Sequence, residues 1–162
     1  MKTMLCYAFI AVLFNACNQT TPPNTGNVVL TATFTVTDTI GEKSTQFHSK
    51  EELILSFSLT NSTNDTLTYP RGNSGPSVIF HILKNDSTVA ASIDGYAYLA
   101  VALPGFLPPG QNLQGGWQAP TTPAQNPKVV LSPGSYTATV SFPTFDQAKV
   151  NPVSPITFSI VP

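Results

Sequence analysis

Apolar and polar residues alternate one by one along several stretches of this chain. Between Val28 and Thr37, four apolar residues are separated by single threonines, and Leu53–Thr60 has leucine or phenylalanine at every second position. A period of two places successive side chains on opposite faces of an extended strand, whereas a helix has a period of about 3.6. The alternation therefore predicts strands with one buried face. No helical pattern lasts for the roughly ten residues that a helix needs.

The remaining predicted strands are short and are separated by turn-forming residues. The chain contains 15 prolines and 10 glycines, which interrupt regular structure and favour turns. Strands are predicted at Val28–Thr37, Leu53–Thr60, Thr66–Tyr69, Val78–Ile82, Thr88–Ser92, Tyr96–Val101, Asn112–Trp117, Ser135–Phe142 and Ile156–Val161. About eight short strands at this spacing are typical of an antiparallel sandwich. We therefore expect an all-β fold, an immunoglobulin-like antiparallel β-sandwich.

The connections between these strands are of two kinds. Asn61–Asp65 and Lys84–Ser87 are rich in Asn, Asp and Ser, residues that form tight turns, and they predict two hairpin-like returns. Leu103–Gly110 and Gln118–Lys128 are richer in proline and predict longer connections between strands.

The N-terminus has the pattern of an export signal. Lys2 supplies a positive charge, Met4–Phe14 is an apolar run of about eleven residues, and Ala16 precedes Cys17. A spanning helix needs roughly 20 apolar residues, so this run is too short to be one. The segment resembles the lipobox of bacterial lipoproteins, which implies a signal peptide over residues 1–16, cleavage before Cys17 and lipidation of its thiol. An ordinary secretory signal or a retained anchor helix are the alternatives.

The mature chain is predicted to consist of a flexible tether and one domain. Residues 17–27 are polar and contain almost nothing that could be buried, so they are interpreted as the tether. Residues 28–162 have the length of a single domain. No acidic residue follows Cys17 closely, and the expected location is therefore the periplasmic face of an outer membrane, with the protein held in the cell envelope by its lipid.

The charge of the chain excludes two classes of partner. Only 9% of the residues are charged, the net charge is −1, and the Lys and Arg residues are scattered singly. Nucleic acids and anionic lipid headgroups both require clustered basic charge. We therefore expect no nucleic-acid binding, and contact with the membrane through the lipid anchor only.

Several short segments occur in an order that matches a known family. They are Leu59–Ser62, Leu67–Gly72, Ser77–Ile82, Leu107–Gln111, Trp117 and Pro133–Thr137. This succession, over roughly Glu51 to Phe142, resembles the intracellular proteinase inhibitor (BsuPI) domain. The resemblance implies a non-catalytic scaffold, with inhibition of a subtilisin-type protease as a special case. The chain departs from the family at Thr88–Ser92, where a tryptophan is expected.

The residues that could carry catalysis or bind a metal do not form a recognised pattern. His48, Asp65 and Ser74 occur in the order of a serine-protease triad, but the chain is too short for that protease fold. A zinc site needs three or four ligands, and the chain has only two histidines and no HExxH pair. We therefore expect no enzyme activity, no metal and no cofactor.

Two groups of residues are candidates for binding. The first group lies in the proline-rich connections, where proline restricts the backbone before a partner binds and lowers the cost of ordering. It consists of Leu103, Pro104, Phe106, Pro108, Pro120 and Pro123. These residues are predicted to contact a protein partner, with a protease as the special case, although they could serve only as strand connections.

The second group is a pair of tyrosines. Tyr96 and Tyr98 are two residues apart and would share one face of a strand, with Trp117 and Phe106 as neighbours. Aromatic rings in such a row can stack on sugars, although in a sandwich they more often fill the core. A carbohydrate-binding or surface-glycan accessory module is therefore the alternative function.

Overall fold

The protein is all-β. The computed structural model describes residues 29–120 and 130–162. These residues form twelve strands: β1 (Val29–Leu30), β2 (Ala32–Thr37), β3 (Gln46–His48), β4 (Leu53–Thr60), β5 (Leu67–Asn73), β6 (Ile79–Lys84), β7 (Ser87–Ala91), β8 (Ala100–Leu107), β9 (Asn112–Ala119), β10 (Gly134–Ser141), β11 (Lys149–Val150) and β12 (Ile156–Val161). Within the described residues, no helix has the length and apolar character needed to cross a membrane.

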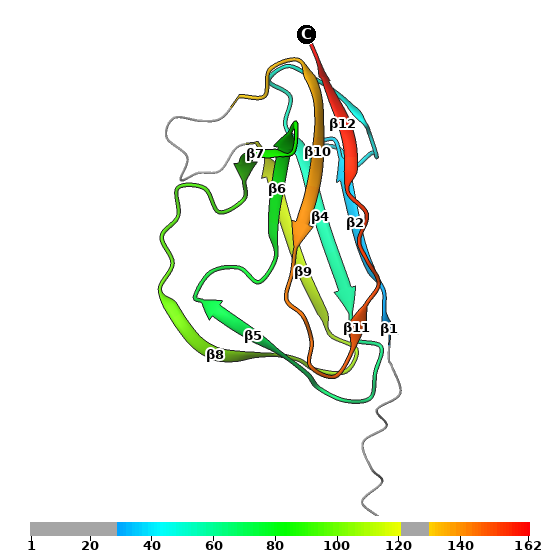
Figure 1. Ribbon diagram of the computed structural model, residues 1–162. Coiled ribbons are helices and arrows are strands. Elements are labelled where there is room, and N and C mark those ends of the chain that lie inside the picture. Colours follow the sequence, from blue (N-terminus) through cyan, green and yellow to red (C-terminus); the bar gives the residue numbers. More distant parts are fainter. Residues whose placement is uncertain (1–28, 121–129) are drawn as a thin grey trace, which may run out of the picture.

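Two sheets form the body of the molecule. One has five strands in the order β3-β12-β10-β6-β7, and the other has three in the order β2-β4-β9. The two sheets lie as layers on either side of a common core (Figure 1). Most neighbours are antiparallel, but β12 pairs with β3 in parallel, and β1 with β11 likewise. The prediction of a purely antiparallel fold of about eight strands is corrected in these respects.

The alternation in the sequence explains which face of each strand is buried. In β4, Leu53, Leu55, Phe57 and Leu59 are buried, whereas the residues between them are half-buried. The inward aromatic rings of the two sheets meet in the core. Phe34 of β2 stacks on Phe80 of β6 with 6.1 Å between ring centroids. Phe57 likewise stacks on Phe142, just beyond β10, at 4.7 Å.

A two-stranded ribbon, β5–β8, extends from this body (Figure 1). The turn predicted at Asn61–Asp65 is present, but it does not make a hairpin, because β4 pairs with β2 and β9 while β5 pairs with β8. The hairpin predicted around Lys84–Ser87 is confirmed by the β6–β7 pairing.

The strand predicted at Tyr96–Val101 and the connection predicted at Leu103–Gly110 are both misplaced. The chain is irregular up to Leu99, and β8 then runs through most of the segment that was expected to be a connection. Pro70 and Pro104 face each other across the ribbon. Proline is tolerated there because each strand of a two-stranded ribbon is an edge strand and needs hydrogen bonds on one side only.

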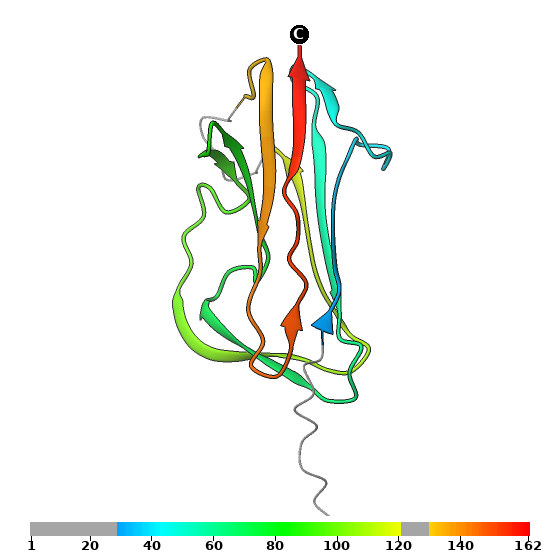
Figure 2. The same cartoon turned by 45° about the vertical axis from the view of Figure 1, so that its right-hand side comes forward.

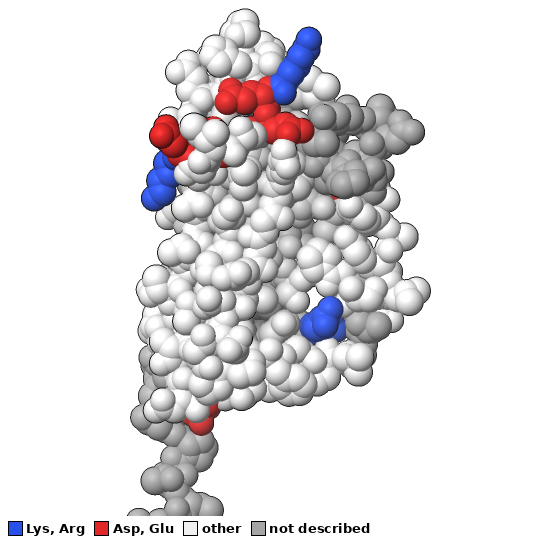
Figure 3. Space-filling model, turned by 180° about the vertical axis from the view of Figure 1, so that it is seen from behind, with Lys and Arg blue, Asp and Glu red and all other residues white. Residues whose placement is uncertain are grey.

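Charged side chains are distributed unevenly between the two ends of the molecule. β1, where the described chain begins, lies at the opposite end from the C-terminus (Figure 2). On the face seen in Figure 3, most of the Lys, Arg, Asp and Glu side chains gather toward the end that carries the C-terminus. The end of the molecule that carries β1 is therefore poor in charge on that face.

Candidate functional site

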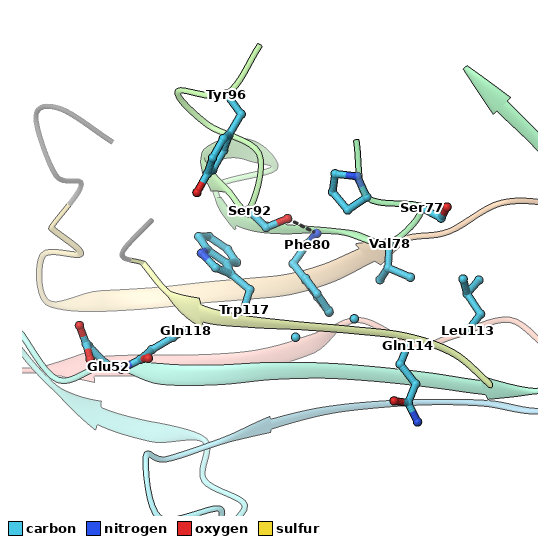
Figure 4. Close-up of a pocket in the computed structure, with 13 residues that line it drawn as sticks. Glu52, Ser77, Val78, Phe80, Ser92, Tyr96, Leu113, Gln114, Trp117 and Gln118 are labelled. Atoms are coloured by element: carbon cyan, nitrogen blue, oxygen red, sulfur yellow. Dashed lines mark hydrogen bonds between the residues drawn. The ribbon is translucent and has the colours of Figure 1, made fainter. Parts of the chain in front are cut away.

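A groove of about 720 Å³ runs along one side of the molecule, where β9 forms the edge of the three-stranded sheet. Its other wall comes from the start of β6 and from the turn that follows β7. The lining residues are Glu52, Pro76, Ser77, Val78, Phe80, Ser92, Tyr96 and Leu113–Gln118. Leu113 lies at one end of the groove and Gln118 at the other (Figure 4). Its size falls within the range of ligand sites, about 300–1,000 Å³.

The first of two adjacent glycines in β9 allows this strand to lie close to Val78 and Phe80, at the start of β6. A Cβ atom on Gly115 would lie 2.7 Å from Cγ1 of Val78, closer than such atoms approach. The same atom on Gly116 would meet nothing within 4 Å. Gly115 therefore sets the depth of the groove, whereas Gly116 faces solvent on the outer side of β9.

Trp117 contributes a buried donor to this groove. The residue is 6% exposed, and its indole rises from β9 toward the turn that carries Ser92 and Tyr96 (Figure 4). Within residues 29–120 and 130–162, its Nε1 atom is the buried side-chain nitrogen that has no hydrogen-bond partner. A buried donor left unpaired costs about 1–3 kcal/mol, so such groups are uncommon and point to a role.

Two polar pairs of the groove are bonded within the protein. The backbone N–H of Phe80 donates to Oγ of Ser92 at 3.0 Å (Figure 4). The side-chain amide of Gln118 donates to the carboxylate of Glu52. Gln114 points away from Val78, to the other side of β9 (Figure 4). The groove therefore presents rings, aliphatic carbons and the edge of β9 rather than a cluster of free side-chain ligands.

The predicted pair of tyrosines is packed together beside the groove. Their rings stack with 5.9 Å between centroids and 22° between planes. Tyr96 is 44% exposed and lines the groove, whereas Tyr98 is half-buried. Tyr98 also lies against Gly75, where an added Cβ would be 2.9 Å from its ring. Tyr96 is thus the member of the pair whose outer face is open.

The predicted protein-binding residues lie mainly on the β5–β8 ribbon. Leu103, Pro104 and Phe106 belong to β8, and Leu103 and Phe106 are 65% and 59% exposed. Leu99, just before β8, is 76% exposed. We call Leu99, Leu103 and Phe106 the ribbon patch.

Other predicted residues are placed elsewhere. Pro108 is exposed in the turn between β8 and β9. Pro120 is buried and follows Ala119 through a cis peptide bond, so it offers no surface to a partner. Pro123 and Cys17 lie outside the described residues.

The residues considered for catalysis have separate structural partners. Nδ1 of His48 lies 3.2 Å from the carbonyl oxygen of Pro162, and Oγ of Ser74 accepts a hydrogen bond from the Leu99 N–H at 3.1 Å. In the part of the chain that the structure describes, no three His, Cys, Asp or Glu residues cluster as metal ligands.

Comparisons with known proteins give no functional assignment. No protein-family model matches the chain, and no curated protein matches it. Among solved structures, it is similar to the alkylpurine DNA glycosylase AlkC of Pseudomonas fluorescens bound to DNA containing an abasic site analog. That similarity has a TM-score of 0.39 at 13% identity, and it covers 82% of this chain but only 30% of the glycosylase chain. At this TM-score the similarity carries no argument about function.

The groove was not identified from the sequence, although two of its residues were noted. Tyr96 and Trp117 were expected to be neighbours and both line it, whereas Phe106 is not among its lining residues. The sequence signal for the groove is the Gly115–Gly116 pair, because glycines inside a strand mark a close approach of another backbone or a ligand.

Proposed function

We propose that this protein is a non-catalytic, lipid-anchored protein of the cell envelope that binds another protein through an immunoglobulin-like domain. The ribbon patch is the observation on which the proposal depends. The patch exposes two leucines and a phenylalanine within one short stretch of the chain, and Leu103 and Phe106, three positions apart in β8, lie on opposite faces of the ribbon. Single exposed apolar side chains are ordinary, but three large ones so close together in the chain, on a ribbon that extends from the body, favour an interaction site. The resemblance to the BsuPI family supports the same class of function.

The immunoglobulin-like assignment is supported by a local feature of β10. The hydroxyl of Tyr136 donates to the carbonyl oxygen of Ser132, four residues earlier, at 2.7 Å. A tyrosine at the start of a strand that bonds back to the chain in this manner is a hallmark of immunoglobulin-like sandwiches. A five-stranded and a three-stranded sheet facing each other agree with that assignment.

The anchoring part of the proposal depends on the N-terminal sequence. A lipid on Cys17 and a polar tether over residues 17–27 would hold the domain close to the periplasmic face of an outer membrane. Two or three acyl chains bind a membrane almost permanently, because each buried methylene contributes about 0.8 kcal/mol. The domain would then search for a partner within the envelope.

Site-specific photo-crosslinking tests the protein-binding surface. A photoreactive phenylalanine derivative is placed at Leu103 or Phe106 in the full chain, in its native cells, and at Ile40 as a control that is 79% exposed. A discrete adduct from the two ribbon positions, absent from Ile40 and lost in Leu99→Asp, is the expected result. Adducts of equal strength from all three positions, or none at all, would contradict the proposal.

Protease inhibition is the special case that the BsuPI resemblance implies. The ribbon would block the cleft of a subtilisin-type protease, with Pro70 and Pro104 reducing the freedom that is lost on binding. Subtilisin turnover is measured with the domain in excess. Full turnover, or digestion of the domain, would remove this special case and leave the broader proposal standing.

Carbohydrate binding is the second candidate, and the open face of Tyr96 beside the groove favours it. A glycan array probed with the protein and with Tyr96→Ala distinguishes the two functions. Glycan binding that disappears in Tyr96→Ala would support carbohydrate binding. An array without any signal would contradict it and would favour protein binding.

A further inference from the structure

The open edge of β9 is a second surface, separate from the ribbon patch. Within the described residues, β9 is paired with β4 on one side and forms the edge of its sheet on the other. It has eight residues, among which are no charged residue and no proline. Natural edge strands are usually short or protected by charges, prolines or bulges, because an open edge pairs with other chains. The edge strands β2 and β7 also lack charges and prolines, but at six and five residues they are shorter than β9, which in addition lines a groove.

The direction of the main-chain groups along this edge follows from the hydrogen-bond ladder between β9 and β4. The N–H of Asn61 donates to the carbonyl of Gln111 at 2.9 Å, one step beyond the pair Thr60 and Asn112. In an antiparallel ladder, opposite residues alternate between pairs that exchange hydrogen bonds and pairs that do not. The main-chain groups of Gln114, Gly116 and Gln118 therefore point away from β4, toward the open edge.

We propose that this edge binds an extended segment of another polypeptide, which adds to the three-stranded sheet as a fourth strand. A peptide in β conformation presents donors and acceptors at the same regular spacing as the outward main-chain groups of β9. A sugar has no such regular spacing of donors and acceptors. The side-chain position of Gly116 lies on the outer face of β9, near Ser56 and Gln114, and an added Cβ there would meet nothing within 4 Å, so it does not obstruct the edge. The surface is independent of the ribbon patch.

The groove also defines the side chains that the bound segment carries. Val78, Phe80 and Trp117 line its apolar inner side, although they are only 4%, 1% and 6% exposed, and the glutamines of β9 lie on its outer side. Successive side chains of a strand point to opposite faces, so the segment alternates apolar with polar residues. The unpaired Nε1–H of Trp117 is a buried donor beside this edge.

Synthetic peptides test this proposal directly. Eight-residue peptides without tryptophan, as long as β9, are selected from a random display library on the purified full chain. Binding is followed by the fluorescence of Trp117, the single tryptophan of the protein. The expected peptides alternate apolar and polar residues and bind with a Kd below about 100 µM. No such peptide, or a saccharide that occupies the groove instead, would overturn the proposal.

Backbone methylation of a selected peptide separates strand addition from other binding. Alternate N–H groups of a strand point to opposite edges. N-methylation of the set that faces β9 is expected to weaken binding at least about tenfold, and methylation of the other set to leave it unchanged. Equal effects of both sets would show that the peptide is not an added strand. This comparison uses the unaltered protein, so no variant has to fold.

Gly116→Pro gives the matching change on the protein. It removes an N–H that points away from β4 and leaves the pairing with β4 in place, since an edge strand accepts proline where its N–H faces outward. Peptide affinity is expected to fall at least about tenfold. Gly116→Ala, which keeps the N–H, is the control and should bind as the unaltered protein does. Undiminished binding by a folded Gly116→Pro would overturn the proposal.

Discussion

The side-chain amide of Asn61 donates to the carbonyl oxygen of Leu107 at 2.8 Å and thereby joins the end of β4 to the end of β8. Asn61 is fully buried. The same amide nitrogen donates to the carbonyl of Asp65 at 2.8 Å, and its Oδ1 accepts from both the N–H and the hydroxyl of Thr63. One side chain thus closes its own turn and attaches the ribbon to the three-stranded sheet.

Asn61→Ala is expected to lower the free energy of unfolding by about 2–4 kcal/mol, because each lost hydrogen bond contributes about 1 kcal/mol and buried partners are left unpaired. Urea denaturation measures the change. Asn64→Ala, an exposed position of the same turn, is the control and should stay within about 0.5 kcal/mol. If both variants lose the same stability, Asn61 does not have the role assigned to it.

Alanine in place of each glycine of the Gly115–Gly116 pair should have opposite effects. Gly115→Ala forces its Cβ against Val78 and is expected to cost about 1–3 kcal/mol, the usual effect of overpacking a core. Gly116→Ala meets nothing and should be neutral or stabilise by up to about 1 kcal/mol, since alanine restricts the unfolded chain. Thermal unfolding of the two variants measures the difference. Similar values would contradict the close approach of β9 and β6.

The sequence predicts the strands whose alternation is long and uninterrupted. β4 has the predicted bounds, and β10 and β12 agree with prediction within one residue at each end. β3 was not predicted, because three residues, Gln46–His48, are too few to reveal a period. β8 was taken for a connection because of Pro104 and Gly105, which a sheet interior would not accept but a ribbon does.

Long-range pairing explains the rest of what the sequence does not reveal. Asn61 lies in a predicted turn and bonds the carbonyl of Asp65 within it, but its bond to Leu107 spans 46 residues. The groove likewise joins β9 to residues on either side of β7. Such contacts depend on which strands are neighbours, and period-two alternation specifies the buried face of a strand but not its partner.

Tyr136→Phe is expected to lower the free energy of unfolding by about 0.5–1.5 kcal/mol, the contribution of one hydrogen bond. The variant keeps the ring, which stacks on Phe158 at 5.7 Å, and removes the donor to the carbonyl of Ser132. Ser132→Ala keeps that carbonyl and removes only the contacts of an exposed hydroxyl, with Lys84 Nζ at 3.1 Å and with the Tyr136 hydroxyl at 3.3 Å, so it should cost less than about 0.5 kcal/mol. A Tyr136→Phe variant as stable as the unaltered protein would remove the support that this corner gives to the immunoglobulin-like assignment.

Two neighbouring residues of β8 should differ sharply in their effect on stability. Leu107 is 4% exposed and Phe106 is 59% exposed. Leu107→Ala is expected to cost about 2–5 kcal/mol, because it leaves a cavity in the core. Phe106→Ala should change stability by less than about 0.5 kcal/mol. It should nevertheless weaken the adduct that the photoreactive group at Leu103 forms with the partner protein. A large loss of stability in Phe106→Ala would mean that the patch is structural and is not available for binding.

The N-terminal sequence makes the final prediction, which concerns Cys17. If the lipobox interpretation is correct, the protein purified from its native membranes begins at Cys17, lacks residues 1–16 and carries acyl chains on this residue. Intact mass spectrometry measures both changes at once. Cys17→Ser removes the thiol that accepts the diacylglyceryl group, so we expect it to abolish lipidation and to leave the signal uncleaved.

Cys17→Ser separates lipidation from plain secretion, because it affects only the lipoprotein route, whereas Ala16→Asp places a charge before the cleavage site, obstructs signal processing of either kind and is the control. A Cys17→Ser protein that is still cleaved and released in soluble form would indicate an ordinary secretory signal. An uncleaved protein with a free thiol in unaltered cells would indicate a retained anchor. In either case the membrane attachment proposed here would be lost, while the ribbon patch and the open edge of β9, which depend on the folded domain alone, would keep their tests.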